Sequence, residues 1–265
     1  MAANLVIRSR ADSPELKKAA ASIEHAAWSD LGFLNYTRSH YEHYADLLDA
    51  YPEYQLCLVD EDTGYPVAVA NSVPVVCSGQ ADLPPEGWDW LVETAARNAN
   101  GRANMLGALA VSVPAVHRSK GYARMMIRSL LELAERKKLD GVVVAVRPSA
   151  KVEHPWVSLS EYITWTDPQG RMHDPWIRSH LASGGKIVGL AERSMVVHER
   201  CRSGRLGPSS ASRRRAIMRS KALLRPSRSM SISGSASTKS RMSGWLTPPD
   251  QAYANVIPVI THDCR

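Results

Sequence analysis

The sequence has few cysteines, and no two of them have the spacing of a metal site. The four cysteines stand at positions 57, 77, 201 and 264, without a C-x-x-C pair. This pattern favours free thiols in a reducing compartment and argues against a disulfide-rich secreted protein or a zinc ribbon. We therefore expect a cytoplasmic protein without a metal centre.

Apolar segments of the kind that enter a membrane are also absent. The first residues, "MAANLVIRSRADSPELKK", lack the apolar core of a signal peptide. Nowhere does the sequence contain a run of roughly 18 apolar residues, the length that a membrane-spanning helix needs. We expect neither a secretion signal nor a membrane partner.

Acidic residues are absent from one long segment. The chain of 265 residues has a net charge of +7, yet residues 1–199 carry 20 Lys or Arg against 24 Asp or Glu. Residues 200–249 carry 12 basic residues and no acid. The basic character therefore belongs to one segment, and we expect a mildly acidic globular domain over 1–197 followed by a basic Ser/Arg-rich tail over 198–265.

Hydrophobic periodicity predicts an α/β domain in which a central mixed, twisted sheet of about six strands is flanked by helices. Within it, residues 105–149 are predicted to form a strand–helix–strand unit with two adjacent parallel strands. The expected strands are 4–10, 54–60, 66–76, 105–113, 140–149 and 186–197, and the expected helices are 14–28, 35–51, 86–100, 119–138 and 174–185.

The loop "RSKGYA" joins the predicted strand 105–113 to the following helix. A helix N-terminus presents unpaired N–H groups and a partial positive charge, which makes it an anion site. Gly121 permits a positive φ, and Arg118 and Lys120 add positive charge. The loop therefore suits a phosphate or pyrophosphate, although it matches neither the Walker A nor the Rossmann glycine pattern.

The segment "LAVSVPAVHRSKGYARMMIRSLLELAERKKLDGVVVAV" resembles the cofactor-binding core of the GCN5-related N-acetyltransferases, the GNAT superfamily. The family signature V-x-P-x-x-R-x-x-G-x-G/A is represented by Val111, Pro114, Arg118, Gly121 and Ala123, with one extra residue between Val111 and Pro114 and one between Pro114 and Arg118. The order of the predicted elements over residues 4–197 is also similar to the GNAT fold.

The resemblance implies that acetyl-CoA is the acyl donor and that an amine attacks its thioester between two splayed central strands. The pyrophosphate would rest on the backbone of residues 118–123, and the pantetheine arm would follow residues 111–113. A backbone N–H from residues 109–111 would stabilise the oxyanion. The positions that the resemblance assigns to the cofactor are Val111, Ser112, Val113, Arg118, Ser119, Lys120, Gly121, Tyr122 and Ala123.

The resemblance is weaker for the catalytic groups. No acid lies between Met105 and Val113, where many family members have a glutamate. The tyrosine that family members have on the next helix would fall at His180, which could protonate the CoA sulfur, contact the cofactor, or be a half-exposed helix histidine. We name His180, Tyr162 and Glu161 as catalytic candidates.

The irregular segment 153–174 is expected to shape the acceptor site, because long loops on a rigid scaffold often carry function. Aromatic residues there are more often packing than pocket wall. Asp174 is explained by helix capping. The remaining polar candidates are Glu153, His154, Asp167 and His173.

The basic tail has two interpretations. It contains 13 serines and 10 arginines over residues 200–249, which is typical of a disordered arm that could bind nucleic acid. The favoured alternative is translation out of frame, because shifted serine codons encode apolar residues and "SRSMSIS" then gains a strand alternation. The sequence shows no seventh strand to pair with the sixth. If the tail is translated out of frame, the sixth strand has a bare edge, and we expect weak or no activity from this product.

The leading hypothesis is an acetyl-CoA-dependent N-acetyltransferase that acts on a primary amine of a small molecule or peptide. A catalytically silent CoA-binding domain and a nucleic-acid-binding protein acting through its tail are the alternatives. Nucleic acid is the less expected partner, and a homodimer is left open.

Overall fold

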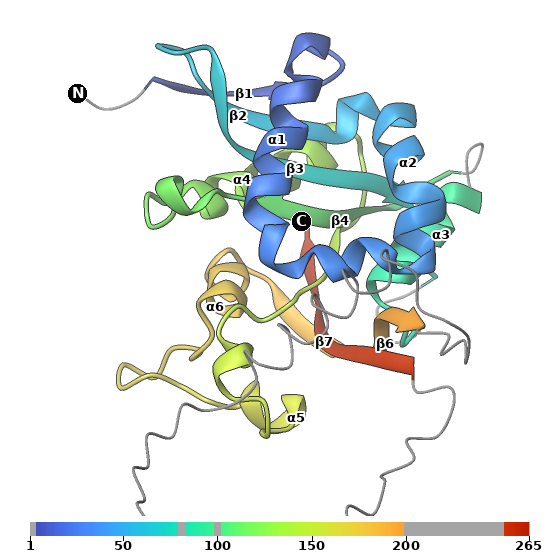
Figure 1. The fold of residues 1–265 in the computed structure, drawn as a ribbon, viewed down its shortest axis with the longest axis vertical. Coiled ribbons are helices and arrows are strands. Elements are labelled where there is room, and N and C mark those ends of the chain that lie inside the picture. The colour runs from blue at the N-terminus through green and yellow to red at the C-terminus, as the bar shows by residue number, and fades with distance from the viewer. Residues whose placement is uncertain (1–3, 79–82, 98–101, 199–251, 265) are drawn as a thin grey trace, which may run out of the picture.

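A mixed β-sheet forms the centre of the molecule (Figure 1). The computed structural model describes residues 4–78, 83–97, 102–198 and 252–264. Over these residues the strand order is β1-β2-β3-β4-β5-β7-β6, and every neighbouring pair is antiparallel except β4 with β5. The strands are β1 (Leu5–Ser9), β2 (Gln55–Asp60), β3 (Tyr65–Val75), β4 (Met105–Ser112), β5 (Gly141–Ala145), β6 (Lys186–His198) and β7 (Ala252–Asp263).

Helices cover both faces of this sheet. Because side chains alternate between the faces along a strand, Leu58 shares a core cluster with Met126 of α4, whereas its neighbour Val59 shares one with Ala20 of α1. The α2 and α3 helices lie on the α1 face. The helices are α1 (Lys17–Trp28), α2 (Ala45–Ala50), α3 (Trp88–Arg97), α4 (Tyr122–Arg136), α5 (Leu159–Tyr162) and α6 (Pro175–Ala182), with the short turns η2 (Ser29–Tyr36) and η3 (His40–Tyr44).

The predicted strand–helix–strand unit is confirmed. β4 and β5 are parallel, with Met105 opposite Gly141 and Ala108 opposite Val144, and α4 connects them. The apolar stripe of α4 packs on the sheet, while its other face carries the exposed Arg128–Glu132 pair. A parallel connection of this kind requires a crossover, and the amphipathic helix supplies it.

The seventh strand differs from the sequence-based expectation. Residues 252–263 form β7, which pairs antiparallel with both β5 and β6, so the expectation that no seventh strand exists is wrong. Pro258 makes the strand hard to predict. A proline has no N–H to donate to a neighbouring strand, so it is rarely found within a central strand. Its carbonyl is used nonetheless and accepts the N–H of Val146 at 2.8 Å. The rest of the predicted tail, residues 199–251, lies outside the described residues, together with both explanations of its composition.

The two parallel strands part at their carboxyl ends. Pairing between β4 and β5 ends at Ala108 and Val144, although β4 continues to Ser112. Next to this point Leu109 is an extra residue in β4, because Asn71 of β3 pairs with Ala110 and Ser72 with Ala108. A bulge of this kind increases the local twist of a strand. The resulting split between β4 and β5 is the geometry that the sequence resemblance implied.

Candidate functional site

A cavity of about 320 Å³ lies at the split between β4 and β5. Its lining includes Ala110 and Val111 from β4 and Ala145 from β5. Helices from opposite faces of the sheet also line it, so the cavity passes through the sheet. We call its two parts the α4 side, with Ile127, Leu130, Leu131, Trp176, His180 and His262, and the α1 side, with Glu24, Trp28, Asn35, His40, Tyr44 and Trp88.

The loop before α4 has the geometry of an anion site. Gly121 is the N-cap residue of α4 at φ +82°, in the left-handed region, and no side chain of the described residues caps this helix end. Ser119 also has a positive φ of 63°. Arg118 donates from Nε to the Val113 carbonyl at 3.3 Å, which holds the loop against the end of β4. The first N–H groups of α4 therefore face solvent beside two cationic side chains, as a phosphate would need.

The strand residues ahead of this loop present one edge to the split. Val111 and Val113 are partly buried against the α4 core, while Ser112 is buried and its Oγ accepts a 2.7 Å hydrogen bond from Trp28 Nε1. Because β5 does not pair with β4 beyond Ala108, an extended chain can lie along this edge. The residues present thus fit an acyl-CoA, because the loop suits a pyrophosphate and the free strand edge runs from it to Val111, which lines the cavity.

His180 is buried on the α4 side, not half-exposed. Its side chain is 3% exposed, its ring lies edge-on to Trp176 at 4.5 Å between centroids, and its Nδ1 is 3.1 Å from His262 Nε2. The Nε2 atom of His180 has no hydrogen-bond partner among the described residues. Burial, and secondly the neighbouring His262, lower the pKa of His180 to about 3.

Tyr162 and Glu161 lie outside the cavity lining. Tyr162 is fully buried and donates to Asp174 Oδ2 at 3.0 Å, and burial followed by the Asp174 charge raises the pKa of this tyrosine. Asp174 Oδ1 caps α6 by accepting from the N–H groups of Trp176 and Ile177, as the sequence predicts. Glu161 is exposed. These contacts give Tyr162 a structural role in joining α5 to α6.

The rest of segment 153–174 also lies outside the lining of the cavity. His154, Trp165 and His173 pack around Tyr162 in a cluster of aromatic rings. Asp167 pairs with Arg171 in the loop. The α1 side of the cavity is therefore built by α1, η2, η3 and α3, and not by the segment that the sequence favours.

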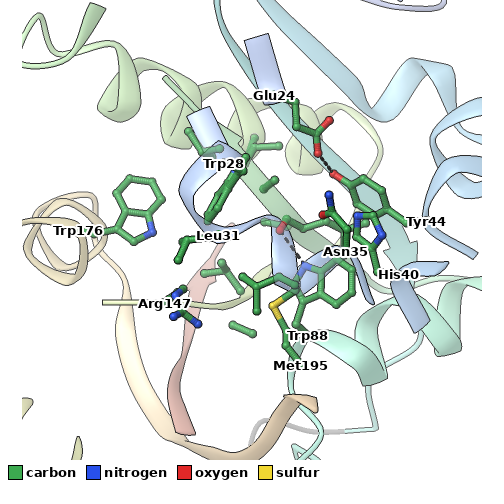
Figure 2. A pocket seen from close by; sticks show the side chains of 18 of the residues that line it. Glu24, Trp28, Leu31, Asn35, His40, Tyr44, Trp88, Arg147, Trp176 and Met195 are labelled. Carbon is green, nitrogen blue, oxygen red and sulfur yellow. Dashed lines mark hydrogen bonds between the residues drawn. The ribbon is translucent and has the colours of Figure 1, made fainter. Parts of the chain in front are cut away.

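Glu24 is the one carboxylate among the residues that line the cavity. Tyr44 donates its hydroxyl proton to Glu24 Oε1 (Figure 2). Asn71 Nδ2 donates to Glu24 Oε2 at 2.9 Å. Arg10 Nη2 donates to Asn71 Oδ1 at 3.2 Å. Since arginine can only donate, Arg10 fixes the orientation of the Asn71 amide and so holds its N–H₂ toward the carboxylate.

Aromatic rings support this carboxylate. His40 stacks on Tyr44 at 4.5 Å between ring centroids, and Trp88 lies 5.9 Å from His40. Trp88 Nε1 donates to the Leu109 carbonyl at 2.8 Å, which ties α3 to the bulge in β4. Burial lowers the pKa of His40, against a hydrogen bond with the Asn35 backbone, so the imidazole is neutral near pH 7.

Sequence reasoning missed the α1 side of the cavity. Glu24 and Trp28 are four residues apart in one helix, a spacing that places them on one face, and this was the available signal. His40 and Tyr44 have the same four-residue spacing, whereas Trp88 joins them only in the folded chain. Within the described residues, no group of His, Cys, Asp or Glu could hold a metal ion, and no helix is long and apolar enough to cross a membrane.

Comparison with known proteins agrees with this geometry. No protein-family profile matches the chain. The chain is 33% identical over 210 residues to the arginine N-acetyltransferase avaD of Aspergillus versicolor, covering 72% of this chain and 71% of that protein. In fold it is similar to the loading GNATL domain of CurA from Lyngbya majuscula, with a TM-score of 0.60, 14% identity and 98% coverage of both chains.

A second solved structure, the GphF GNAT-like decarboxylase in complex with isobutyryl-CoA, has a TM-score of 0.59 at 15% identity and covers 98% of this chain and 100% of that one. The two structures support the fold alone, whereas the 33% identical relative supports the activity. Acetyl-CoA is accordingly the acyl donor, and the enzyme is an N-acetyltransferase. The chain belongs to the GCN5-related N-acetyltransferase superfamily.

Proposed function

We propose that the enzyme transfers the acetyl group of acetyl-CoA to a primary amine of a small acceptor that carries a second positive charge. The observation that carries this proposal is the Glu24 carboxylate, held by two hydrogen bonds at the wall of the cavity that passes through the β4–β5 split. A carboxylate has about four lone-pair directions. Glu24 therefore keeps acceptor capacity for a cationic group of the substrate.

In this proposal acetyl-CoA, the acyl donor, binds mainly to backbone groups of the enzyme. Residues 118–123 place the N–H groups of the α4 N-terminus around the pyrophosphate, and Arg118 and Lys120 add charge. The pantetheine arm lies along Val111, Ser112 and Val113 and brings the thioester to the split. A backbone N–H of the bulged segment 109–111 faces the carbonyl oxygen on which negative charge develops.

His40 is our candidate for the base. An amine is protonated near pH 7 and must lose a proton before it can attack. A neutral imidazole on the α1 side can take that proton as the N–C bond forms and the C–S bond breaks. The thiolate leaves with its electron pair, and a thiol of ordinary pKa near ~8.5 is a good leaving group that needs little help from an acid.

Arginine is the acceptor to test first. The relative named avaD is an arginine N-acetyltransferase, and a guanidinium matches the carboxylate geometry of Glu24. Arg147 lines the same cavity, and in Figure 2 Glu24 lies at the top of the group of side chains drawn while Arg147 lies apart from it, at the lower left. An arginine in the cavity would extend from Glu24 toward Arg147, with its carboxylate at the Arg147 end.

The experiment compares three acceptors by the rate of CoA release. We expect arginine to be acetylated, agmatine, which lacks the carboxylate, to react more weakly, and citrulline, which lacks the positive charge, to react least. Glu24→Gln should reduce kcat/KM for arginine about 10–100-fold and remove the preference over citrulline, because a charge-assisted hydrogen bond is worth about 1.5–3 kcal/mol. Mass spectrometry of the product would identify the acetylated nitrogen.

Glu15→Gln is the matched control, since Glu15 is exposed and lies outside the lining. Its kinetics should equal those of the wild-type enzyme. Binding of acetyl-CoA without transfer to any amine of a broad panel would contradict the proposed function and support a silent CoA-binding domain. Transfer that does not depend on Glu24 would leave acetyl transfer in place and overturn the charged-acceptor part.

A further inference from the structure

Met195 of β6 has a backbone conformation that residues with a side chain rarely adopt. Its φ is +53°, in the left-handed region, which is unusual for a long apolar residue. Among the described residues other than glycine, only Ser119 and Lys138 share a positive φ. A strained residue persists only where its surroundings hold it, and such residues are concentrated at functional sites. The conformation of Met195 therefore calls for a cause and a use.

The strained residue lies in a bulge of β6. From Ser194 to Val197 the chain takes three steps along β6 while its partner β7 takes two. Neighbouring side chains of a regular strand point to opposite faces, whereas a bulge can re-aim one of them. Here both neighbours face α3, because Ser194 Oγ accepts the Trp88 N–H at 3.1 Å and Met195 packs against the cluster that contains Trp88. The bulge thus turns Met195 toward the same helix as Ser194.

Asp89, in the first turn of α3, holds the bulge in place. Its side chain is buried, and its Oδ2 accepts a hydrogen bond from the Met195 N–H. A second attachment lies two residues earlier in β6. The Arg193 N–H donates to the Pro85 carbonyl at 2.9 Å, and its guanidinium pairs with Glu86 at 2.6 Å. The bulge is therefore fixed against the start of α3 at Met195 itself and at Arg193 just before it.

This arrangement makes the Met195 side chain part of the cavity wall. Met195 lines the cavity and is only partly buried, so a ligand in the cavity can contact it. In Figure 2 Glu24 lies at the top of the side chains drawn and Met195 at the bottom, with His40 and Trp88 between them. Methionine is a long, polarizable apolar side chain, and it suits contact with the apolar part of a ligand. Met195 thus lies well away from the carboxylate that is proposed to bind the charge of the acceptor.

We propose that Met195 limits the length of the acceptor, and that Asp89 is a positioning residue that acts through Met195. The inference rests on the proposed function, because it takes the cationic end of the acceptor to bind Glu24. An acceptor held there extends toward the part of the cavity lined by Arg147 and Met195. A longer acceptor must displace the Met195 side chain, and the fixed bulge resists that displacement.

Arginine and homoarginine, which differ by one methylene, test the length limit. We expect the wild-type enzyme to favour arginine about 10-fold in kcat/KM, the usual effect of one methylene in an apolar pocket, and Met195→Ala to lose this preference. Met195→Gly should lose it as well and melt at a higher temperature than Met195→Ala, because glycine adopts a positive φ without strain. Met172→Ala is the matched control, since Met172 is partly buried but lies outside the lining. It should keep the preference.

Two variants of Asp89 test its positioning role. Asp89→Asn keeps an oxygen that can accept the Met195 N–H, and Asp89→Leu removes it. We expect the preference for arginine to survive in Asp89→Asn and to be lost in Asp89→Leu, although Met195 itself is unchanged. Combining Asp89→Leu with Met195→Ala should relax the preference no further than either change alone, because the two residues act as a unit. A merely structural role would lower kcat/KM for arginine and homoarginine by the same factor.

Several results would overturn the proposal. An undiminished preference for arginine in both Met195→Ala and Met195→Gly would show that Met195 does not limit the acceptor, and these two variants decide the point even where Asp89→Leu fails to fold. Use of propionyl-CoA gained by Met195→Ala at an unchanged preference for arginine would place Met195 against the acyl group instead. Failure of the proposed function looks different, because acetyl-CoA would then bind normally while wild type and all variants acetylated neither arginine, homoarginine nor any other amine.

Discussion

The proposed donor site and the α1 side of the cavity are built in different ways. The proposed donor site next to the α4 side is a backbone site, in which the N-terminus of α4, the positive φ of Gly121 and the free edge of β4 belong to one continuous segment. The α1 side is a side-chain site, in which Glu24, Tyr44 and Asn71 come from three elements far apart in the sequence. A backbone site constrains only a few residue types, whereas a side-chain site can be rebuilt for another acceptor without changing the fold.

The largest effect is expected from Gly121→Glu. The residue has φ +82°, which disfavours any L side chain, and the new carboxylate would face the pyrophosphate. We expect acetyl-CoA binding to weaken by ~100-fold or more, equivalent to about 2.7 kcal/mol, so that acetyl-CoA no longer raises the melting temperature. Differential scanning fluorimetry with and without acetyl-CoA measures this directly.

Gly121→Ala is the control for backbone strain. A Cβ atom at this position would meet nothing within 4 Å, so alanine tests the conformation without adding charge or a clash. We expect the free energy of unfolding to fall by about 1–2 kcal/mol, the cost of a non-glycine residue in the left-handed region. If acetyl-CoA still raised the melting temperature of Gly121→Glu as it does for wild type, donor binding would not depend on the loop backbone. The contrast between a backbone site and a side-chain site would then be wrong.

The contrast between a backbone site and a side-chain site also explains which features the sequence could predict. The loop, the parallel strand pair and the capping of α6 by Asp174 follow from local rules of spacing, glycine and capping, and the structure confirms the strand pair and the cap. The roles of the loop residues stay a prediction. Local rules suffice here because the interactions are made within one segment of about 40 residues, a typical strand–helix–strand length.

The α1 side and β7 could not be predicted in this way. Hydrogen bonds from Asn71 and Tyr44 hold the Glu24 carboxylate, and only the tertiary fold brings these residues together. β7 contains Pro258, follows a long basic segment and pairs with β5 across more than a hundred residues of sequence. The β-branched residues on both sides of Pro258 favour a strand, and tertiary pairing accommodates the proline that argues against one.

The two sides should also respond in opposite ways to acid. On the α4 side burial lowers the pKa of His180 to about 3 from an ordinary 6.5, so the unfolded chain binds more protons and stability falls as pH drops below 6.5. Next to the α1 side, at the residue that follows Trp88, burial raises the pKa of Asp89 to about 6 from 3.8, against a hydrogen bond from the Met195 N–H. The folded chain then binds more protons, and stability rises as pH falls through 6.

Melting temperatures of two variants measure this opposition. Relative to wild type, His180→Asn should become less destabilising as pH falls from about 7 to about 5, and Asp89→Asn should become less stabilising over the same range. As the pH falls from about 6 to 3.8, the two pKa values of Asp89, this group adds about 2 kcal/mol to the free energy of unfolding. Shifts of the same sign in both variants would contradict the assignment of opposite slopes to the two sides.

Tyr44→Phe should have the smallest effect and the most selective one. The change removes the hydroxyl that donates to Glu24 Oε1 and leaves the Asn71 contact in place, so the carboxylate stays but is held less firmly. We expect the KM of the acceptor to rise about 3–10-fold at an unchanged dissociation constant for acetyl-CoA, since one hydrogen bond is worth about 1 kcal/mol. Tyr41→Phe is the matched control, because Tyr41 is 83% exposed on the same short turn. An equal loss of acetyl-CoA affinity in Tyr44→Phe would mean that the two sides are coupled through the split, and the separation of a backbone site from a side-chain site would no longer hold.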